Sequence, residues 1–135
     1  MGGRGASRVI SYYRDKHGRF TRYGEEYRCE LEVGRIKFVY RQERNGFRDP
    51  PAPPMDTRTW GRIYVTIGKK DKLKTITFYD RQGHKKSQID LDHPHKGEMP
   101  HKHLGYLQHR DGKMTKFDRW IIKYVTQLWE EHKND

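Results

Sequence analysis

Alternating hydrophobic and polar residues dominate the middle of the chain and predict β-strands. In "RIYVTI", Ile63, Val65 and Ile67 recur at a period of two residues, which places their side chains on one face of a strand. The same alternation predicts further strands at 35–42, 73–80 and 85–91. The connections "GKKDK" and "DRQGH" have hairpin length, and Gly83 suits the left-handed position of a type I turn with a bulge. We therefore expect an antiparallel meander over residues 62–91.

The pattern changes to a helical period near the C-terminus. Thr115 and Asp118 have the Thr-x-x-Asp spacing of a capping box. Apolar residues then recur every three or four positions, at Phe117, Ile121, Tyr124 or Val125, and Leu128. We expect a helix over about 117–132 that packs on the sheet. The predicted fold class is α+β, a small antiparallel sheet (β-meander) packed against a C-terminal α-helix.

The rest of the chain is less regular. Residues 1–26 are polar, basic and rich in glycine without a sustained period, so we expect a loosely ordered segment followed by a single α+β domain over 27–135. The proline-rich stretch 48–55 is expected to form a surface connector. The tryptophans are expected in the core or at its edge, and the single cysteine is expected to be buried. These residues are Trp60, Trp120, Trp129 and Cys29.

Charge narrows the class of partner. The chain has 29 Lys and Arg against 18 Asp and Glu, a formal net charge of +11. Such a field attracts polyanions, and neutralised phosphates release counterions. We expect nucleic acid as the partner, with RNA favoured, and no membrane, because the C-terminal segment has few basic residues. A lone cysteine excludes an internal disulfide and a cysteine-rich zinc site.

No targeting segment is evident in the sequence. The longest apolar runs are far shorter than the ~18 residues of a membrane span, and "MGGRGASR" lacks the apolar segment of a secretory signal. We expect no signal peptide, and a location in the cytoplasm of a producer or target cell or on a virion.

Histidines concentrate in "DLDHPHKGEMPHKHLGYLQH", which holds five of the eight in the chain. The cluster begins where the third strand of the meander ends, and such edges often carry binding or catalytic groups. A further short strand is expected over 101–106. Alternation there places His101 and His103 on one face. His93 and His95 are less well defined because a proline separates them.

These residues suit metal-independent cleavage of RNA. The reaction needs a base for the 2′-hydroxyl proton, an acid for the leaving 5′-oxygen and a cation near the phosphate, and histidine can perform either proton role near neutral pH. The candidate catalytic residues are His93, His95, His101 and His103. Candidates for substrate binding are Lys85, Lys86, Lys96, Lys102 and Tyr106, the tyrosine by a hydrogen bond to phosphate or by stacking on a base. No cofactor is expected for this reaction.

Two other interpretations of the histidine cluster stay open. In a metal-dependent nuclease, Asp90, Asp92, His101 and His103 would supply nitrogen and oxygen ligands for Zn²⁺ or Mn²⁺. The neighbouring lysines would oppose a dication and favour a phosphate. In a non-enzymatic nucleic-acid-binding module of a phage head or packaging apparatus, the histidines would be solvated loop residues and the net charge would suffice for binding.

The segment "YDRQGHKKSQID", followed by "PHKHLGY", resembles C-terminal modules of phage minor head proteins and polymorphic-toxin-like proteins of Gram-positive bacteria and their integrated elements. The likeness covers most of the chain from Gly2 to the predicted helix. It implies a toxin module, often an RNase, that is attached to a larger phage or toxin carrier protein and neutralised by an acidic immunity protein. The motif positions are Asp90, His93 or His95, His101, His103 and Tyr106.

Overall fold

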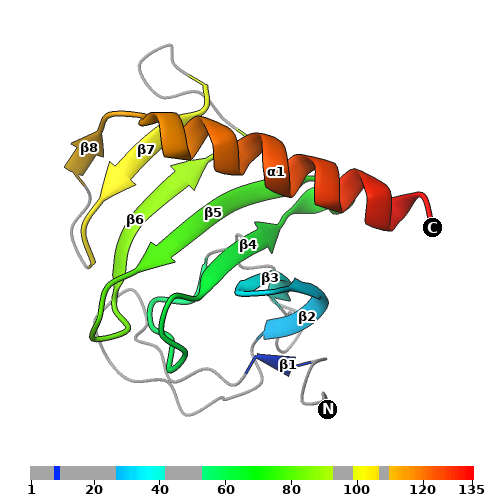
Figure 1. Ribbon diagram of the computed structural model, residues 1–135, viewed down its shortest axis with the longest axis horizontal. Helices are drawn as coiled ribbons and strands as arrows, with labels where there is room; N and C mark the ends of the chain where they lie inside the picture. Colours follow the sequence, from blue (N-terminus) through cyan, green and yellow to red (C-terminus); the bar gives the residue numbers. More distant parts are fainter. Residues whose placement is uncertain (1–7, 10–26, 42–52, 93–98, 107–109) are drawn as a thin grey trace.

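The computed structural model describes five segments of the chain, namely 8–9, 27–41, 53–92, 99–106 and 110–135. Within these segments, eight strands form one sheet and a single α-helix follows them. The strands are β1 (Arg8–Val9), β2 (Tyr27–Val33), β3 (Ile36–Arg41), β4 (Ile63–Ile67), β5 (Leu73–Tyr79), β6 (Lys85–Asp90), β7 (His101–Leu104) and β8 (Arg110–Gly112). A short 3-10 turn, η1 (Lys69–Asp71), joins β4 to β5, and α1 (Lys116–Lys133) ends the chain. Figure 1 shows the helix lying along the sheet.

The strands lie in the sheet in the same order as in the sequence. Neighbouring strands are antiparallel except β3 and β4, which run parallel. The predicted meander over 62–91 is confirmed as β4, β5 and β6. Gly83 has φ +85° in the turn between β5 and β6, as its expected left-handed role requires.

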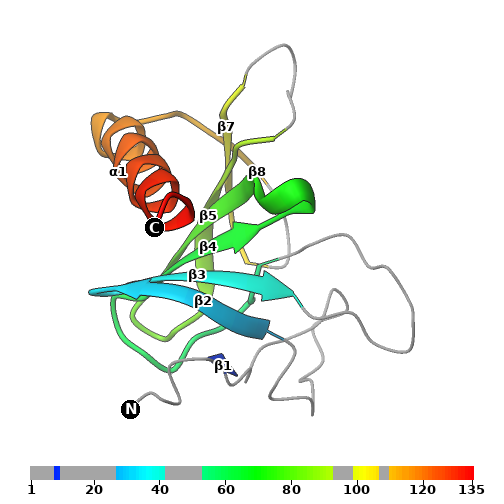
Figure 2. The ribbon, with the colours of Figure 1, turned by 90° about the vertical axis from the view of Figure 1, so that its right-hand side faces the viewer.

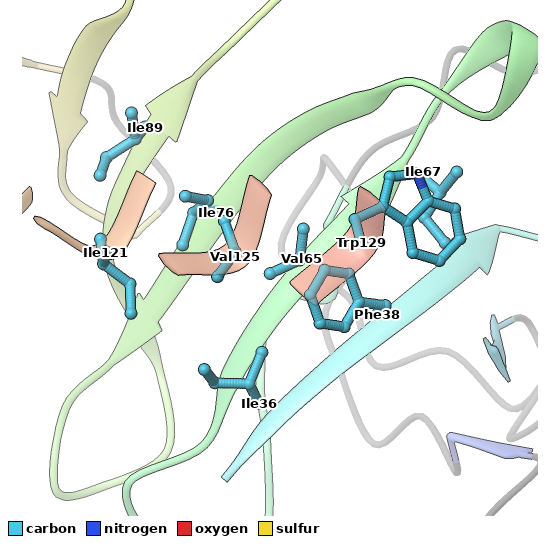
Figure 3. Close-up of a cluster of buried hydrophobic side chains, with 9 residues drawn as sticks. All are labelled: Ile36, Phe38, Val65, Ile67, Ile76, Ile89, Ile121, Val125 and Trp129. Carbon is cyan, nitrogen blue, oxygen red and sulfur yellow. The ribbon is translucent and has the colours of Figure 1, made fainter. Parts of the chain in front are cut away.

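The helix covers one face of the sheet (Figure 2). It begins with the predicted capping box, because Thr115 accepts from the Asp118 backbone amide while the Asp118 carboxylate accepts from the Thr115 amide. Its apolar side packs on the inward side chains of four strands, which alternate in the β-pattern. The core comprises Ile36, Phe38, Val65, Ile67, Ile76, Ile89, Ile121, Val125 and Trp129 (Figure 3). The α+β fold expected from the sequence is therefore confirmed.

Several expectations about single residues are wrong. Trp60 and Trp120 are 65% and 54% exposed, whereas Trp129 is buried as expected. Phe117 is also exposed, because the helix turns Asp118, rather than its aromatic neighbour, toward the sheet. The helical period predicts which residues share one face of the helix, but the contact with the sheet sets how many of them are buried.

The proline-rich connector and the first long strand also differ from expectation. Pro53 and Pro54, the described prolines of that stretch, are buried rather than on the surface. The Tyr79 hydroxyl donates to the Pro54 carbonyl oxygen, which draws this segment onto the sheet. The segment Tyr27–Val33 forms β2 although no strand was predicted there. Its sequence "YRCELEV" does alternate at the period of a strand.

The opposite face of the sheet carries polar side chains toward the β6 and β7 side. Register places Thr66 beside Thr75, and Thr75 beside Asp90, so these residues share a face. At the β2 and β3 side the same face is aromatic and apolar, with Tyr27, Cys29, Val39, Tyr64 and Tyr79 buried together. Burial raises the pKa of the Cys29 thiol, which agrees with the expected buried cysteine. No helix in the described segments is long and apolar enough to span a membrane.

Candidate functional site

The register of β6 and β7 brings together residues that the sequence separates. Asp90 lies opposite His101, and Gln88 lies opposite His103. Directly opposite residues on antiparallel strands share a face, so all four side chains lie on the face away from the helix. The expectation that His101 and His103 share a face is confirmed.

Asp90, His101 and His103 form a tight triangle, here called the buried triad. Asp90 Oδ2 lies 3.1 Å from His101 Nε2 and 3.1 Å from His103 Nε2. The two Nε2 atoms are 3.0 Å apart, and the rings meet edge to face. The side chains of His101 and His103 are only 5% and 16% exposed. Three atoms able to coordinate a cation therefore converge on one point inside the protein.

A second layer of polar contacts fixes the carboxylate of the buried triad. Gln88 Nε2 donates to Asp90 Oδ1 at 2.7 Å, and Lys85 Nζ donates to Gln88 Oε1 at 3.3 Å. All of these groups are buried. Burial lowers the pKa of Lys85, and the Asp90 charge offsets part of that effect. Lys85 is thus linked to the triad through the Gln88 amide. The amide binds Asp90 Oδ1, while Oδ2 faces the two histidines.

Two residues expected beside the histidines have other partners. Lys102 lies between His101 and His103 in sequence but on the helix face, where its Nζ donates to Asp118 Oδ2 at 2.8 Å. Burial alone would raise the pKa of Asp118, but the bonds from Lys102 and Thr115 hold it below its usual value. Asp92, expected as a fourth metal ligand, pairs with Lys74 at 3.1 Å and is not among the converging groups.

A second constellation, Asp56, His84 and Tyr106, lies at the other end of β6 and is here called the exposed triad. His84 Nδ1 pairs with the buried Asp56 Oδ1. The Tyr106 hydroxyl donates to Asp56 Oδ2 at 2.7 Å, and its ring lies 4.7 Å from the imidazole, centroid to centroid. The His84 side chain is 40% exposed. Asp56 thus holds the imidazole from the protein side and leaves Nε2 on the opposite edge of the ring.

Backbone contacts fix the exposed triad in place. Asp56 and His84 form a β-bridge, and the Thr57 amide donates to the Gly83 carbonyl oxygen at 2.8 Å. A side chain at Gly83 would collide with the Thr57 carbonyl oxygen, so the close approach needs glycine. The His84 amide donates to Asp80 Oδ1 at 2.9 Å.

Exposed cations flank the exposed triad in sequence. Arg58 follows Asp56 by two residues, and Lys86 follows His84 by two residues. Arg81 lies in the turn between β5 and β6, just before His84. All three are exposed. The β-bridge between Asp56 and His84 brings their two segments together. The arrangement can transfer a proton through an imidazole next to groups that attract phosphate.

Some of the predicted site residues lie outside the described part of the chain, and one makes a contact that was not expected. His93, His95 and Lys96 lie outside the described residues. Tyr106, expected to contact substrate, is bonded to Asp56 instead. Asp56 was missed because it is far from the histidines in sequence, 28 positions from His84. One feature of the sequence indicated its role, since Asp56 directly follows the proline-rich stretch. Prolines restrict the backbone, so the residue after such a stretch has a well-defined position.

The motif that carries the likeness to toxin modules is divided between the two triads. Asp90, His101 and His103 belong to the buried triad, and Tyr106 belongs to the exposed triad. The likeness itself stays a prediction. No protein-family model matches the chain, and no curated protein or solved structure is significantly similar to it.

Proposed function

We propose that this chain is a metal-independent RNA endonuclease in which His84 is the proton acceptor. The observation that carries this proposal is a half-exposed imidazole whose Nδ1 is held by a buried carboxylate. A carboxylate in that position fixes the ring and its tautomer and stabilises the imidazolium that forms after proton transfer. The proposal keeps the reaction expected from the sequence but assigns the base to His84, which is not among the four predicted catalytic residues His93, His95, His101 and His103.

Access to solvent distinguishes the two sets of histidines. A polynucleotide must bring a 2′-hydroxyl within about 3 Å of the catalytic nitrogen. His84 is 40% exposed, whereas His101 is 5% exposed and its Nε2 faces Asp90 and His103. An acid and a base that act on opposite sides of a phosphate also need room for that phosphate between them. The 3.0 Å between the two Nε2 atoms of the buried triad leaves none.

The chemistry follows from the exposed triad and its surroundings. His84 Nε2 accepts the 2′-hydroxyl proton as the 2′-oxygen bonds to phosphorus. The bond from phosphorus to the 5′-oxygen then breaks, and water protonates the leaving oxygen. Exposed Arg58, Arg81 and Lys86 stabilise the charge that develops on the phosphate. The net charge of +11 attracts the polyanionic substrate.

The biological setting that we propose is a toxin module attached to a larger phage or toxin carrier. The support is the likeness around "PHKHLGY" and the basic charge, which suits both RNA and an acidic immunity protein. Such an inhibitor would cover the exposed triad, because that is where access to the base can be blocked. A nucleic-acid-binding module without chemistry is the alternative, and it predicts RNA binding without turnover.

Labelled RNA and a matched strand with one 2′-deoxynucleotide test the reaction class. The wild-type protein should cleave the RNA to a 2′,3′-cyclic phosphate and a 5′-hydroxyl, and the deoxy position should resist cleavage. EDTA should leave the rate unchanged at a temperature well below the melting temperature of the EDTA-treated protein. Cleavage of DNA, 5′-phosphate products or a strict need for added metal would each contradict the proposal.

The His84→Gln variant tests the assigned base, and His132→Gln is its matched control. His132 is also a partly exposed histidine paired with a carboxylate, Glu30, at 3.2 Å. His132 lies in the last turn of α1 and Glu30 lies on β2, and neither residue belongs to the exposed triad. We expect His84→Gln to lower kcat by about 10² to 10⁴, with RNA affinity unchanged, and His132→Gln to cleave like the wild type. Equal activity in both variants would exclude His84 as the base.

A further inference from the structure

We propose that Asp90, His101 and His103 bind one divalent transition-metal ion, with Zn²⁺ as the working probe. The inference does not depend on whether the chain cleaves RNA, because it rests on a different set of atoms. It departs from the expectation that no cofactor is needed. It also differs from the ligand set expected from the sequence, since Asp92 takes no part.

Proton placement in the buried triad is the first argument. A neutral imidazole has one N–H, and an ionised carboxylate only accepts. If both Nε2 atoms donate to Asp90, the 3.0 Å contact between them joins two donors. If one Nε2 donates to the other, the second nitrogen presents a lone pair to the carboxylate at 3.1 Å. Protons can therefore make at most two of the three contacts attractive, whereas a shared cation makes all three attractive.

The spacing of the three atoms is the second argument. A triangle with sides of 3.0, 3.1 and 3.1 Å has its corners roughly 1.8 Å from its centre. A metal at the usual distance of about 2.1 Å from each atom would sit roughly 1.1 Å out of that plane. The ligand–metal–ligand angles would then be about 95°, between octahedral and tetrahedral values. Two imidazoles and one carboxylate suit zinc and its neighbours among the transition metals.

The surroundings supply the third argument. Gln88 anchors Asp90 through the carboxylate oxygen that does not face the histidines, as outer hydrogen bonds do around metal ligands. Two of the lysines that were expected to repel a dication bond to groups other than the three converging atoms. Lys102 donates to Asp118 on the helix face, and Lys85 donates to Gln88. A metal ion would thus meet one carboxylate and two imidazoles in its coordination sphere.

The position of the buried triad indicates what the metal does. Asp90 is the last residue of β6, and His101 is the first of β7. An ion bound to both clamps the two strands at the end of the hairpin where the connection between them begins and ends. Binding only to the folded state must stabilise that state. The metal therefore fixes the β6, β7 and β8 side of the sheet.

Metal titration of the full chain tests the inference without any nucleic acid. Protein stripped with a chelator and dialysed should bind one Zn²⁺ per chain by calorimetry, and Co²⁺ should give the absorption bands of a coordinated ion. The melting temperature should rise by roughly 5 to 15 °C when free Zn²⁺ exceeds its dissociation constant about 100-fold. No binding at 100 µM protein and metal would overturn the inference.

Variants then locate the ion. His103→Gln removes one ligand at the least buried corner, and Asp90→Asn removes the carboxylate charge. Both should weaken Zn²⁺ binding by about 10² or more and abolish the rise in melting temperature. His84→Gln keeps all three ligands and should bind like the wild type. If Asp90→Asn does not fold, His103→Gln decides alone. Undiminished Zn²⁺ binding in His103→Gln would overturn the inference, whatever the outcome for RNA cleavage.

Discussion

Both triads pair an aspartate with histidine, yet the orientation and exposure of their imidazoles differ. Each begins with a carboxylate that pairs with histidine, one at either end of β6, roughly 20 Å apart along the strand. In the buried triad, two Nε2 atoms and one oxygen face each other inside the protein. In the exposed triad, a single imidazole is held through Nδ1 and reaches solvent. Orientation and exposure, rather than the pairing of aspartate with histidine, distinguish the proposed ligand set from the proposed proton acceptor.

The positions of the lysines near the buried triad differ between the sequence and the structure. Counted along the chain, the lysines close to this triad would oppose a dication. Strand alternation sends Lys102 to the helix face, and Gln88 stands between Lys85 and Asp90. Local charge counted along the chain therefore misjudges the field at a point in a sheet, because neighbouring residues face opposite ways.

Two single substitutions should affect the two triads separately. His84→Gln should lower RNA cleavage by about 10² to 10⁴ without changing the Zn²⁺-dependent melting temperature. His103→Gln should abolish the Zn²⁺ effect and leave cleavage within a few-fold of the wild type at low temperature. Single-turnover cleavage and thermal melts on the same preparations measure both. If His103→Gln lost cleavage as severely while still folded, the buried triad would be the reactive centre.

Substitution of the two partners of His84 should have smaller effects. Asp56→Asn should lower kcat by about 10², because an amide no longer fixes the imidazole tautomer or stabilises the imidazolium. Tyr106→Phe keeps the ring beside the imidazole and removes only the hydroxyl that donates to Asp56. We therefore expect kcat to fall about tenfold or less. KM and the melting temperature should change little in either variant. A rise in KM with unchanged kcat would instead assign these residues to substrate binding.

The helix face beneath the buried triad provides a test by stability. Asp118→Ala removes the capping bond and the partner of Lys102, so unfolding free energy at pH 7 should fall by about 1 to 2 kcal/mol. The pKa of Asp118 is lowered in the folded state. Its stabilisation is therefore present above the unfolded-state pKa and is lost as pH falls through the lower folded-state value. Urea denaturation should show the variant and the wild type converging below about pH 4, and a constant difference would contradict the assignment.

The smallest expected effect separates the lysines of the two regions. Lys86 is exposed two residues from His84, whereas Lys102 is tied to Asp118. In a His84→Gln background that cannot cleave, Lys86→Gln should weaken RNA binding about fivefold and reduce the salt slope by about one. Lys102→Gln should leave that slope unchanged. Fluorescence anisotropy at several salt concentrations measures both, and equal slopes would show that Lys86 contacts no phosphate.

Local patterns in the sequence were sufficient to predict the class of fold and the location of the meander. Alternation in "RIYVTI" and the segments that follow identified β4, β5 and β6, and the Thr115 capping box identified the start of α1. These features depend on neighbours within a few residues, and the backbone periods of strand and helix are fixed locally. Alternation also placed His101 and His103 on one face.

Long-range contacts, in contrast, set which groups meet. Asp56 reaches His84 across 28 positions because a β-bridge joins their segments, and no local pattern encodes that pairing. The parallel pairing of β3 with β4 likewise depends on the sheet as a whole. The meeting of Asp90 with the two histidines of β7 follows from register, since a shift of one residue reverses the face that every side chain occupies. The contacts between aspartate and histidine in both triads join different segments of the chain, and the pairing of those segments sets their distances.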